Sequence, residues 1–442
     1  VVSAAHGSHA DRGEPWLRLA DLAEHAHGLI ALLGSDSEIG RHLAGRHVQA
    51  ANQALVRWQQ AMGPERLRIA IGSQRTEPAH HASTSRAAQA WQWARSQSVP
   101  VVLANPVRYL DPSDARVADV LDAARRLVPV SSPQIERNNG EADLKTPRAL
   151  AALAADIAAA AGESLPDLLR ATCALAEACV IDPIRDMGIG SVVVPELDLL
   201  VGRQTPSDPQ AAIRHAQSLL EQRCRDGIDR RYGSGDRSIV EQRLADELHA
   251  IASLGFAGYF LTVAEVVELI KVNGIRVAAR GSGAGSLVTY LLGISGVDPI
   301  DHGLLMERFM SPLRRALPDI DIDVESARRL EAYDLIYQRF GSERVACVSM
   351  AETYRVRHAI RDVGAALGFP PGETDAFAKA FPHIRARDAR AALQDLPELR
   401  RSGFGRMAAE GRLDGFLSLV ESLDGLPRHI AMHPCGVLLA DA

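Results

Sequence analysis

Three aspartates stand at alternate positions near residue 320, and their spacing is the feature of this sequence that points most directly to chemistry. Asp319, Asp321 and Asp323 alternate with β-branched isoleucine and valine. Residues two apart in a strand face the same side, and β-branched residues favour strands. We therefore expect a strand over residues 318–324, with carboxylates on one face and an apolar anchor on the other. Clustered carboxylates repel one another unless a cation lies among them, and hard oxygen ligands suit Mg²⁺.

The acidic alternation has two other interpretations. An exposed edge strand with a solvated acidic face gives the same pattern, because charges on edge strands discourage unwanted pairing. An EF-hand calcium loop is disfavoured, because its turn glycine and distal glutamate do not follow Asp323. A second segment, earlier in the chain, favours the catalytic interpretation over the solvated edge.

That segment is the Gly/Ser loop, residues 280–286, which an apolar run over residues 287–292 follows. Glycines let backbone N–H groups approach an anion, and the helix that follows would offer its positive N-terminus to phosphate. Arg280 adds a guanidinium fork. The loop lacks the Gly-Lys-Ser/Thr of a Walker A motif, and alone it could be a plain linker. Together with a carboxylate strand it predicts metal-assisted phosphoryl chemistry on a triphosphate.

The segment that joins the two motifs carries a family resemblance. Residues 280–325, RGSGAGSLVTYLLGISGVDPIDHGLLMERFMSPLRRALPDIDIDVE, resemble the palm of the bacterial C-family DNA polymerases, the DNA polymerase III α-subunit class. Residues 343–368, ERVACVSMAETYRVRHAIRDVGAALG, look more like the error-prone branch than the replicative branch. Glu325 departs from a phenylalanine common near this position in replicative members, which favours the same branch. The resemblance covers nearly the whole chain and is strongest from about residue 245.

The resemblance implies roles for individual residues. Asp319 and Asp321 match the two metal-binding aspartates of the family, and Asp323 would tune their electrostatics without being a ligand. The residues expected to bind or support the nucleotide triphosphate are Arg280, Gly281, Ser282 and Arg308. Further expected contacts to nucleotide or DNA, for which a solvated role stays open, are Arg314, Arg315, Arg355, Arg357 and His433.

Composition limits the class of protein. The 442 residues suffice for about two to four domains, and 47% hydrophobic residues can build their cores. The five cysteines include no C-x-x-C pair, which disfavours a zinc site or a disulfide framework and fits a reduced, cytoplasmic setting. No apolar run reaches membrane-spanning length and no signal peptide opens the chain, so we expect no membrane partner. The formal charge of −6 means that DNA must be contacted through local basic patches.

The expected fold class is α/β and multidomain. Strands alternate with helices in the first part of the chain, which predicts parallel β/α architecture. This part resembles the latter portion of the PHP (polymerase and histidinol phosphatase) domain. The expected domains are a partial PHP domain over residues 1–128, a linker and connecting helix over 129–164, a polymerase β-like palm over 165–349, a helical thumb over 350–428 and a return to the palm over 429–442.

Metal-loaded PHP domains hold a metal cluster with histidine and acidic residues at strand ends. The resemblance places one motif of that cluster at Asn105-Pro106-Val107-Arg108. Arg108 stands where the family has histidine, and a guanidinium has no lone pair to offer a metal. His80 and His81 lie in a polar loop and are expected at the surface. We therefore expect a PHP fold without the metal cluster.

The resemblance implies that the function is DNA-directed DNA polymerase, most similar to error-prone enzymes of translesion synthesis in DNA repair. Asp319 and Asp321 would hold two Mg²⁺ ions, while the Gly/Ser loop and Arg308 neutralise phosphates. The implied partners are primer–template DNA, dNTPs and, through regions outside this chain, a sliding clamp and accessory mutagenesis proteins.

Other interpretations stay open, both for the branch of the polymerase family and for the class of protein. A replicative DNA polymerase III α subunit shares the same motifs. A PHP-type metal hydrolase and a non-catalytic DNA-binding scaffold are candidates of other classes. The chain looks cut at both ends, and the third carboxylate of the family would lie beyond Ala442. We therefore expect this stretch alone to have little or no polymerase activity.

Overall fold

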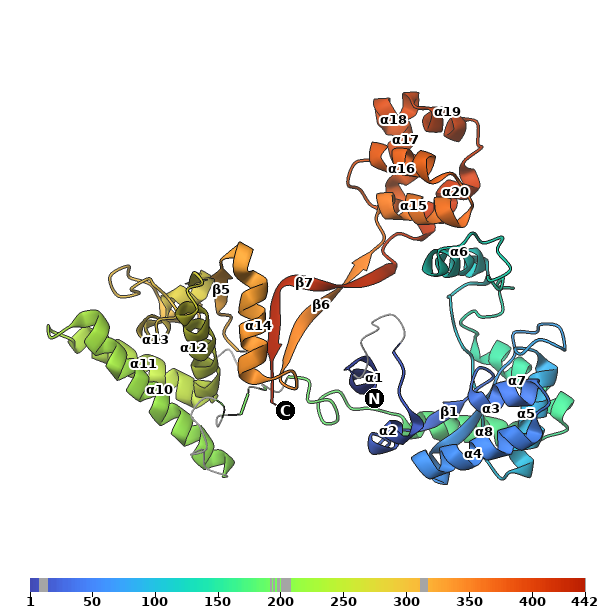
Figure 1. The fold of residues 1–442 in the computed structure, drawn as a ribbon, viewed down its shortest axis with the longest axis horizontal. Coiled ribbons are helices and arrows are strands. Elements are labelled where there is room, and N and C mark those ends of the chain that lie inside the picture. Colours follow the sequence, from blue (N-terminus) through green and yellow to red (C-terminus); the bar gives the residue numbers. More distant parts are fainter. Residues whose placement is uncertain are drawn as a thin grey trace. The chain divides into compact units, whose positions relative to one another are not determined.

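The computed structural model describes residues 1–7, 15–190, 193, 195–196, 199, 208–310 and 317–441. The described chain is α/β, with three small sheets among many helices (Figure 1). It divides into two compact units, Val1–Asp182 with Thr353–Arg428 and Pro183–Glu352 with His429–Ala442.

A parallel sheet in the order β1–β2–β3 organises the start of the first unit. Its strands are β1 (Ala31–Leu33), β2 (Leu67–Ile71) and β3 (Val101–Leu103). β3 is buried throughout and β2 alternates buried with half-buried residues, as in a sheet that helices cover. The expected alternation of strands and helices is confirmed. The helices of this part are α1 (Val2–Gly7), α2 (Leu19–Glu24), α3 (Glu38–Ala44), α4 (Val48–Met62), α5 (Thr84–Ser96), α7 (Pro147–Ala161) and α8 (Leu165–Ala178).

The rest of the first unit is helical. Helix α6 (Ala115–Arg126) follows the sheet in sequence, yet its Val120 and Ala123 share a hydrophobic core with Ile360 and Leu417, far along the chain. The other helices of this core are α15 (Val356–Ala366), α16 (Pro371–Ala380), α17 (Ala389–Asp395), α18 (Pro397–Arg401), α19 (Gly403–Ala409) and α20 (Asp414–Ser422). The helical character expected after residue 350 is thus confirmed from α15 onward.

The second unit contains a separate core. Phe260 and Phe309 pack edge to face in it, with ring centroids 6.2 Å apart, and Phe340 is fully buried beside them. Two short antiparallel strands, β4 (Val277–Arg280) and β5 (Asp321–Val324), lie against this core. The helices of the unit are α10 (Pro209–Tyr232), α11 (Ser238–Leu254), α12 (Ala257–Val272), α13 (Leu287–Leu291) and α14 (Arg329–Phe340).

A two-stranded sheet completes the described structure. It pairs β6 (Val345–Thr353) with β7 (Pro427–Leu439). Short 3₁₀ turns connect other elements, namely η1 (Pro64–Arg66), η2 (Pro112–Asp114), η3 (Gly281–Gly285), η4 (Met306–Arg308), η5 (Ser326–Arg328) and η6 (Ala386–Asp388).

Within the described ranges, no helix by itself combines the length and apolar character that a membrane span requires. Helices α11 and α12 meet both criteria only when taken as a pair, and the chain bends by 112° between them.

Candidate active site

The acidic strand is confirmed in its alternation but is shorter than expected. β5 begins at Asp321, whereas the sequence predicted a strand from residue 318. Pro318 has no N–H to donate to a strand ladder, and its carbonyl instead accepts a hydrogen bond from the Tyr259 hydroxyl at 2.9 Å. Asp319 therefore lies exposed on irregular backbone just before the strand.

The two faces of β5 differ as the alternation predicted. Ile320 and Ile322 pack against a small apolar cluster formed by Ala264, Val267 and Ile294. On β4, Arg280 is paired with Asp321 and Ala278 with Asp323, so the two aspartates lie on one face of the sheet.

One guanidinium faces this acidic surface. Arg280 Nε donates to Asp323 Oδ1 at 3.0 Å, and Arg280 Nη1 lies 3.3 Å from Asp321 Oδ2. Among the residues that the structure describes, Asp319 has no ion-pair partner and Arg280 is the only cation paired with the other two. Three carboxylates and one guanidinium thus give this stretch a net negative charge. Burial and the charges of Asp319 and Asp321 raise the pKa of Tyr259, so its hydroxyl stays protonated beside them.

The Gly/Ser loop comes close to the acidic strand, and its glycines make this approach possible. Gly281 has φ +68°, and a Cβ there would lie only 3.1 Å from Asp321 Oδ2. A Cβ on Gly285 would lie 3.2 Å from the Leu305 carbonyl oxygen. The Gly283 carbonyl accepts from Thr289 Oγ1 at 2.6 Å, which closes the loop onto α13. The loop is therefore built against the carboxylate strand rather than being a plain linker.

The expectation that the following helix would offer its N-terminus to phosphate is wrong. Helix α13 has five residues, and its first N–H groups are already bonded to a protein carboxylate. Glu247 on α11 is fully buried and accepts from Leu287 N at 2.9 Å and Val288 N at 3.1 Å. It also accepts from Ser286 Oγ at 2.7 Å. The preference of a helix N-terminus for negative charge is thus satisfied inside the protein.

Arg243 completes this buried link. Its Nε donates to Glu247 Oε1 at 2.7 Å, and its Nη2 donates to the carbonyls of Gly285 at 3.0 Å and Leu304 at 3.2 Å. Sequence reasoning missed this pair. A signal was present, because Glu247 stands on the apolar face of α11, between buried Leu244 and Leu248. An acid on a buried helix face requires a partner.

The pair positions the turn that carries Arg308. Turn η4 begins just after Leu304, and the side chain of Arg308 at its end is exposed. Arg308 makes no hydrogen bond or ion pair to any residue in the described part of the chain. The structure therefore brings together, within the second unit, the Gly/Ser loop, the turn of Arg308 and the acidic strand.

The structure describes three of the other five expected contact residues. Arg314 and Arg315 lie outside the described residues. His433 is half-buried on β7. In the first unit, Arg355 is exposed at the start of α15, while Arg357 donates to the Phe381 carbonyl at 2.7 and 2.8 Å, a bond that fixes the end of α16.

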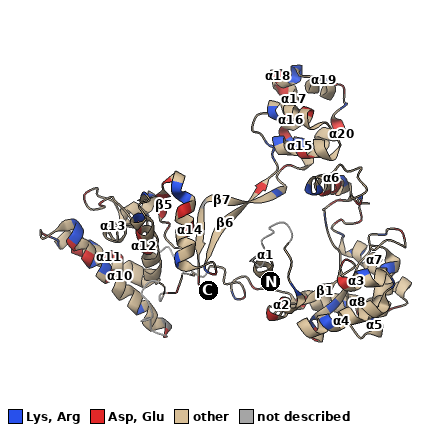
Figure 2. Cartoon of the chain, viewed as in Figure 1, with Lys and Arg blue, Asp and Glu red and all other residues tan. Residues whose placement is uncertain are grey.

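The helices of the first unit carry arginines that are largely balanced by acids. Arg361 pairs with Asp375 at 2.8 Å and Arg385 with Asp424 at 2.8 Å. Figure 2 shows the resulting mixture of positive and negative residues on α15 to α20. A phosphate would therefore compete with aspartates for these guanidinium groups.

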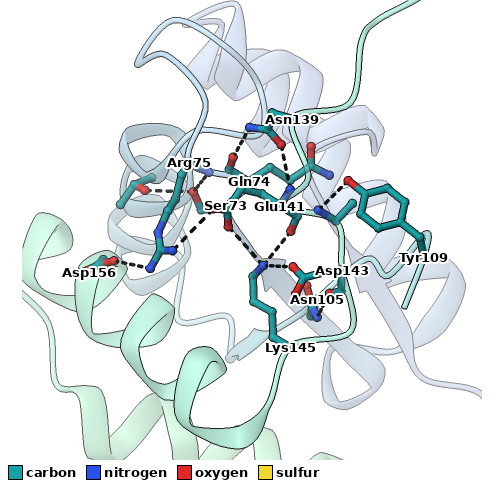
Figure 3. A network of polar contacts seen from close by, with 12 residues as sticks. Ser73, Gln74, Arg75, Asn105, Tyr109, Asn139, Glu141, Asp143, Lys145 and Asp156 are labelled. Atoms are coloured by element: carbon teal, nitrogen blue, oxygen red, sulfur yellow. Dashed lines mark hydrogen bonds and ion pairs between the residues drawn. The ribbon is translucent and has the colours of Figure 1, made fainter. Parts of the chain in front are cut away.

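A polar network lies at the carboxyl end of the β1–β3 sheet, where the resemblance placed the PHP motif (Figure 3). Its centre is Lys145, whose side chain is 5% exposed. The ammonium contacts Asp143 Oδ1 at 2.5 Å, the Glu141 carbonyl at 2.8 Å and Glu141 Oε2 at 3.2 Å. Burial acts to lower the pKa of Lys145, but its hydrogen bonds to Asp143 and Glu141 outweigh burial and raise the pKa. Arg108, from the same motif, is engaged with Asp122 at 2.7 Å.

The chain is similar in sequence to known bacterial DNA polymerases. Residues 218–442 match the family model described as the NTPase domain of bacterial DNA polymerase III alpha. The chain is 32% identical over 432 residues to an error-prone DNA polymerase of Symbiobacterium thermophilum, covering 97% of this chain and 37% of that protein. It is 32% identical over 441 residues to a DNA polymerase III subunit alpha of Xylella fastidiosa strain 9a5c, covering 96% and 34%.

A shorter match is closer in sequence. An error-prone DNA polymerase of Anaeromyxobacter dehalogenans strain 2CP-C is 39% identical over 243 residues, which are 54% of this chain and 21% of that protein. The matched stretches thus span 37%, 34% and 21% of the length of these three relatives.

Proposed function

Because this chain belongs to the family of the bacterial DNA polymerase III α subunits, we propose that it contributes the nucleotide-joining site of a DNA-directed DNA polymerase. In this reaction the primer 3′-hydroxyl attacks the α-phosphorus of a dNTP on a DNA template, and pyrophosphate leaves. The observation that carries the proposal is the pairing of β4 with β5. This pairing sets the Gly/Ser loop directly against Asp321, beside a surplus of negative charge.

The domain roles follow from the same family. The second unit, with the Gly/Ser loop and β5, is proposed as the palm. The β1–β3 sheet and its helices are proposed as part of a PHP domain, and helices α15 to α20 as the thumb that grips primer–template DNA. The single apolar core that α15 to α20 share supports their acting as one body.

The donor set at β5 fits divalent metal ions. Carboxylate oxygens are the ligands that Mg²⁺ prefers, and three aspartates against one arginine leave negative charge for a cation to neutralise. Asp319 and Asp321 are the proposed ligands. Bound metal ions would supply activation of the primer hydroxyl and charge stabilisation at the phosphates.

The protein groups around these ligands have separate roles. Arg280 offsets part of the negative charge of Asp321 and Asp323 through the contacts at 3.3 and 3.0 Å. The backbone of Gly281 and Ser282 is proposed to approach the triphosphate, and Arg308 to bind its β- and γ-phosphates. Since α13 offers no vacant N–H groups at its start, loop backbone and arginine side chains must bind the phosphates instead.

The error-prone branch is favoured within the family. The quoted relatives include error-prone DNA polymerases at 32% and 39% identity, and also a DNA polymerase III subunit alpha at 32%. We therefore propose synthesis past damaged template bases, with the replicative role as the second candidate.

Primer extension by the full-length protein with Mg²⁺ tests both points, on undamaged template and on template with an abasic site. We expect extension past the lesion, and loss of all extension in the Asp319→Asn/Asp321→Asn variant. The matched control is Asp334→Asn, an exposed aspartate on α14. Extension that stalls at the lesion would favour the replicative role. Extension that survives in the double variant would refute the proposed site.

A further inference from the structure

Two adjacent histidines in the first unit converge with a glutamate from a distant segment. His80 and His81 lie in the loop between β2 and α5, and Glu136 lies in the segment between α6 and α7. One ligand atom from each residue lies within 4.8 Å of the other two. His80 Nε2 is 2.7 Å from Glu136 Oε1, and the two imidazole rings have centroids 4.3 Å apart.

The loop that carries the histidines is held by its own backbone. His80 Nδ1 accepts from Ala82 N at 3.2 Å, which directs Nε2 toward Glu136. Gln74 N donates to the Ala82 carbonyl at 2.8 Å, and Ser83 Oγ donates to the Pro78 carbonyl at 3.1 Å. In the neutral ring this bond leaves the proton on Nε2, so a metal ion at Nε2 would displace that proton and the bond from Ala82 N would be given up.

The segment that carries Glu136 is held from both sides. Ile135 is 6% exposed and packs in the core that α6 shares with α15 to α20. Asn138 N donates to Asp119 Oδ1 at 2.9 Å. Glu136 is itself exposed, but its backbone is fixed opposite His80 by these two neighbours.

A second carboxylate, which could be a fourth ligand, lies within reach. His81 Nε2 is 3.8 Å from Asp36 Oδ1, and Asp36 lies in the loop after β1. His81 and Asp36 also line a cavity of about 630 Å³. The loops that follow parallel strands gather at one edge of the sheet, and ligands of α/β proteins commonly bind there.

We propose that His80, His81 and Glu136 bind a transition-metal ion of the zinc class. Two imidazoles and one carboxylate are a donor set typical of Zn²⁺ and of neighbouring ions such as Co²⁺ and Ni²⁺, whereas Mg²⁺ and Ca²⁺ prefer oxygen ligands alone. The fourth position is left to water or to Asp36. This site does not use the motif around Arg108, where the family resemblance placed a metal cluster, and it does not depend on the proposed polymerase activity.

Binding of this ion would connect the loop after β2 to the segment that packs on the helical core of the same unit. The three ligands come from two stretches more than fifty positions apart in sequence. A metal ion that bridges them closes a long loop and should stabilise the folded unit.

The test is metal titration of the full-length protein in excess Mg²⁺, which occupies the oxygen-only sites. Zn²⁺ is titrated against a chromophoric chelator, and Co²⁺ is followed by its visible absorption. We expect one Zn²⁺ bound with micromolar affinity or better, and affinity lower by about 100-fold or more in His80→Ala/His81→Ala. Glu136→Gln should weaken binding by roughly 10-fold.

The matched control is His42→Ala/His47→Ala. It removes two imidazoles from the same unit, whose rings have centroids 6.5 Å apart and of which His42 lies 3.9 Å from Glu38. This variant should keep the affinity of the unaltered protein. Thermal melting in EDTA confirms that each variant is folded, and Glu136→Gln provides a second readout if the double histidine variant is not. Absence of Zn²⁺ binding, or equal affinity in all folded variants, would overturn the proposal.

Discussion

The network around Lys145 and the strand pair β4–β5 both bring carboxylates together, but they balance the negative charge differently. Around Lys145 a buried ammonium contacts Asp143 and Glu141 at 2.5 and 3.2 Å, and the surrounding backbone supplies further hydrogen bonds (Figure 3). At β5, Asp321 and Asp323 share the exposed guanidinium of Arg280, and Asp319 just before the strand has no ion-pair partner among the described residues.

This difference separates two kinds of polar cluster. A scaffold, such as the network around Lys145, holds the fold together, whereas a site, such as the aspartates at β5, can bind a ligand. A buried ion pair with satisfied hydrogen bonds is costly to break from one side only, so it fixes the loops that it joins. An exposed surplus of like charge destabilises its own surroundings slightly and gives the protein affinity for cations. Glu247 belongs with the scaffold, because every contact of its carboxylate is to the protein interior. Substitutions in the scaffold should therefore lower stability, and substitutions in the site should lower function.

The largest expected effect is on catalysis. Asp321→Asn in the full-length protein should lower the rate of nucleotide addition by at least about 10³-fold, or about 4 kcal/mol of activation free energy, because a proposed metal ligand would lose its charge. Its melting temperature without metal should stay equal or rise, since repulsion with Asp319 and Asp323 is relieved. Single-turnover primer extension and thermal melting measure the two effects. If Asp321→Asn lowers the melting temperature instead, Asp321 is part of the scaffold.

The second effect is on stability. Glu247→Ala should lower the free energy of unfolding by roughly 3–5 kcal/mol, because the Arg243 guanidinium and the N–H groups of Leu287 and Val288 would lose a buried partner. Urea unfolding measures the loss. Glu241→Ala, an exposed acid on the same helix, is the control and should stay within about 0.5 kcal/mol. A loss below about 1 kcal/mol for Glu247→Ala would show that the buried link does not hold the loop.

The local part of the site could be predicted from the sequence. The two-residue alternation placed Asp321 and Asp323 on one face and Ile320 and Ile322 on the other, because side-chain direction in a strand depends only on position. The sequence also predicted that the loop glycines allow close backbone approach to an anion, but the positive φ of Gly281 is known only from the structure. The length of the strand could not be predicted in this way, because Pro318 ends the ladder and its carbonyl accepts a hydrogen bond from Tyr259 on helix α12.

The tertiary part could not be predicted in the same way. The bond from Leu287 N to Glu247 joins two helices that are separated by α12, β4 and the Gly/Ser loop, and no local pattern pairs them. Lysines are rarely buried, so nothing in the sequence around Lys145 indicated its position. The packing of α6 on the α15–α20 core likewise depends on residues more than two hundred positions later. The β/α order of the first unit was predictable because each helix and each strand has its own hydrophobic periodicity, which does not depend on distant residues.

The third effect tests the scaffold at Lys145. Lys145→Met should cost about 2–4 kcal/mol of stability near neutral pH, because Asp143 and Glu141 would keep their charge without the buried ammonium. The folded pKa of Lys145 lies above its ordinary value of 10.5, so its contribution is complete below that pH and is lost as pH rises through the folded pKa. Urea unfolding at pH 7, 9 and 11 should show a constant difference between the two proteins at pH 7 and 9 and a smaller one at pH 11. A difference that grows at pH 11 would contradict this assignment.

The smallest expected effect concerns Arg280, the cation of the exposed site. Arg280→Gln should change stability by less than about 1 kcal/mol, because exposed ion pairs contribute little. Its effect on metal binding should be opposite in sign to that of the aspartate variants. Removing a positive charge 3.3 Å from Asp321 should strengthen Mn²⁺ binding several-fold, measured by electron paramagnetic resonance of the free ion. Arg276→Gln is the control, because Arg276 lies near Glu325 at 3.5 Å and pairs with none of the three aspartates in the described structure. If Arg280→Gln weakens Mn²⁺ binding instead, Arg280 acts mainly by holding the carboxylates in place. Arg280 would then belong to the scaffold as well as to the site.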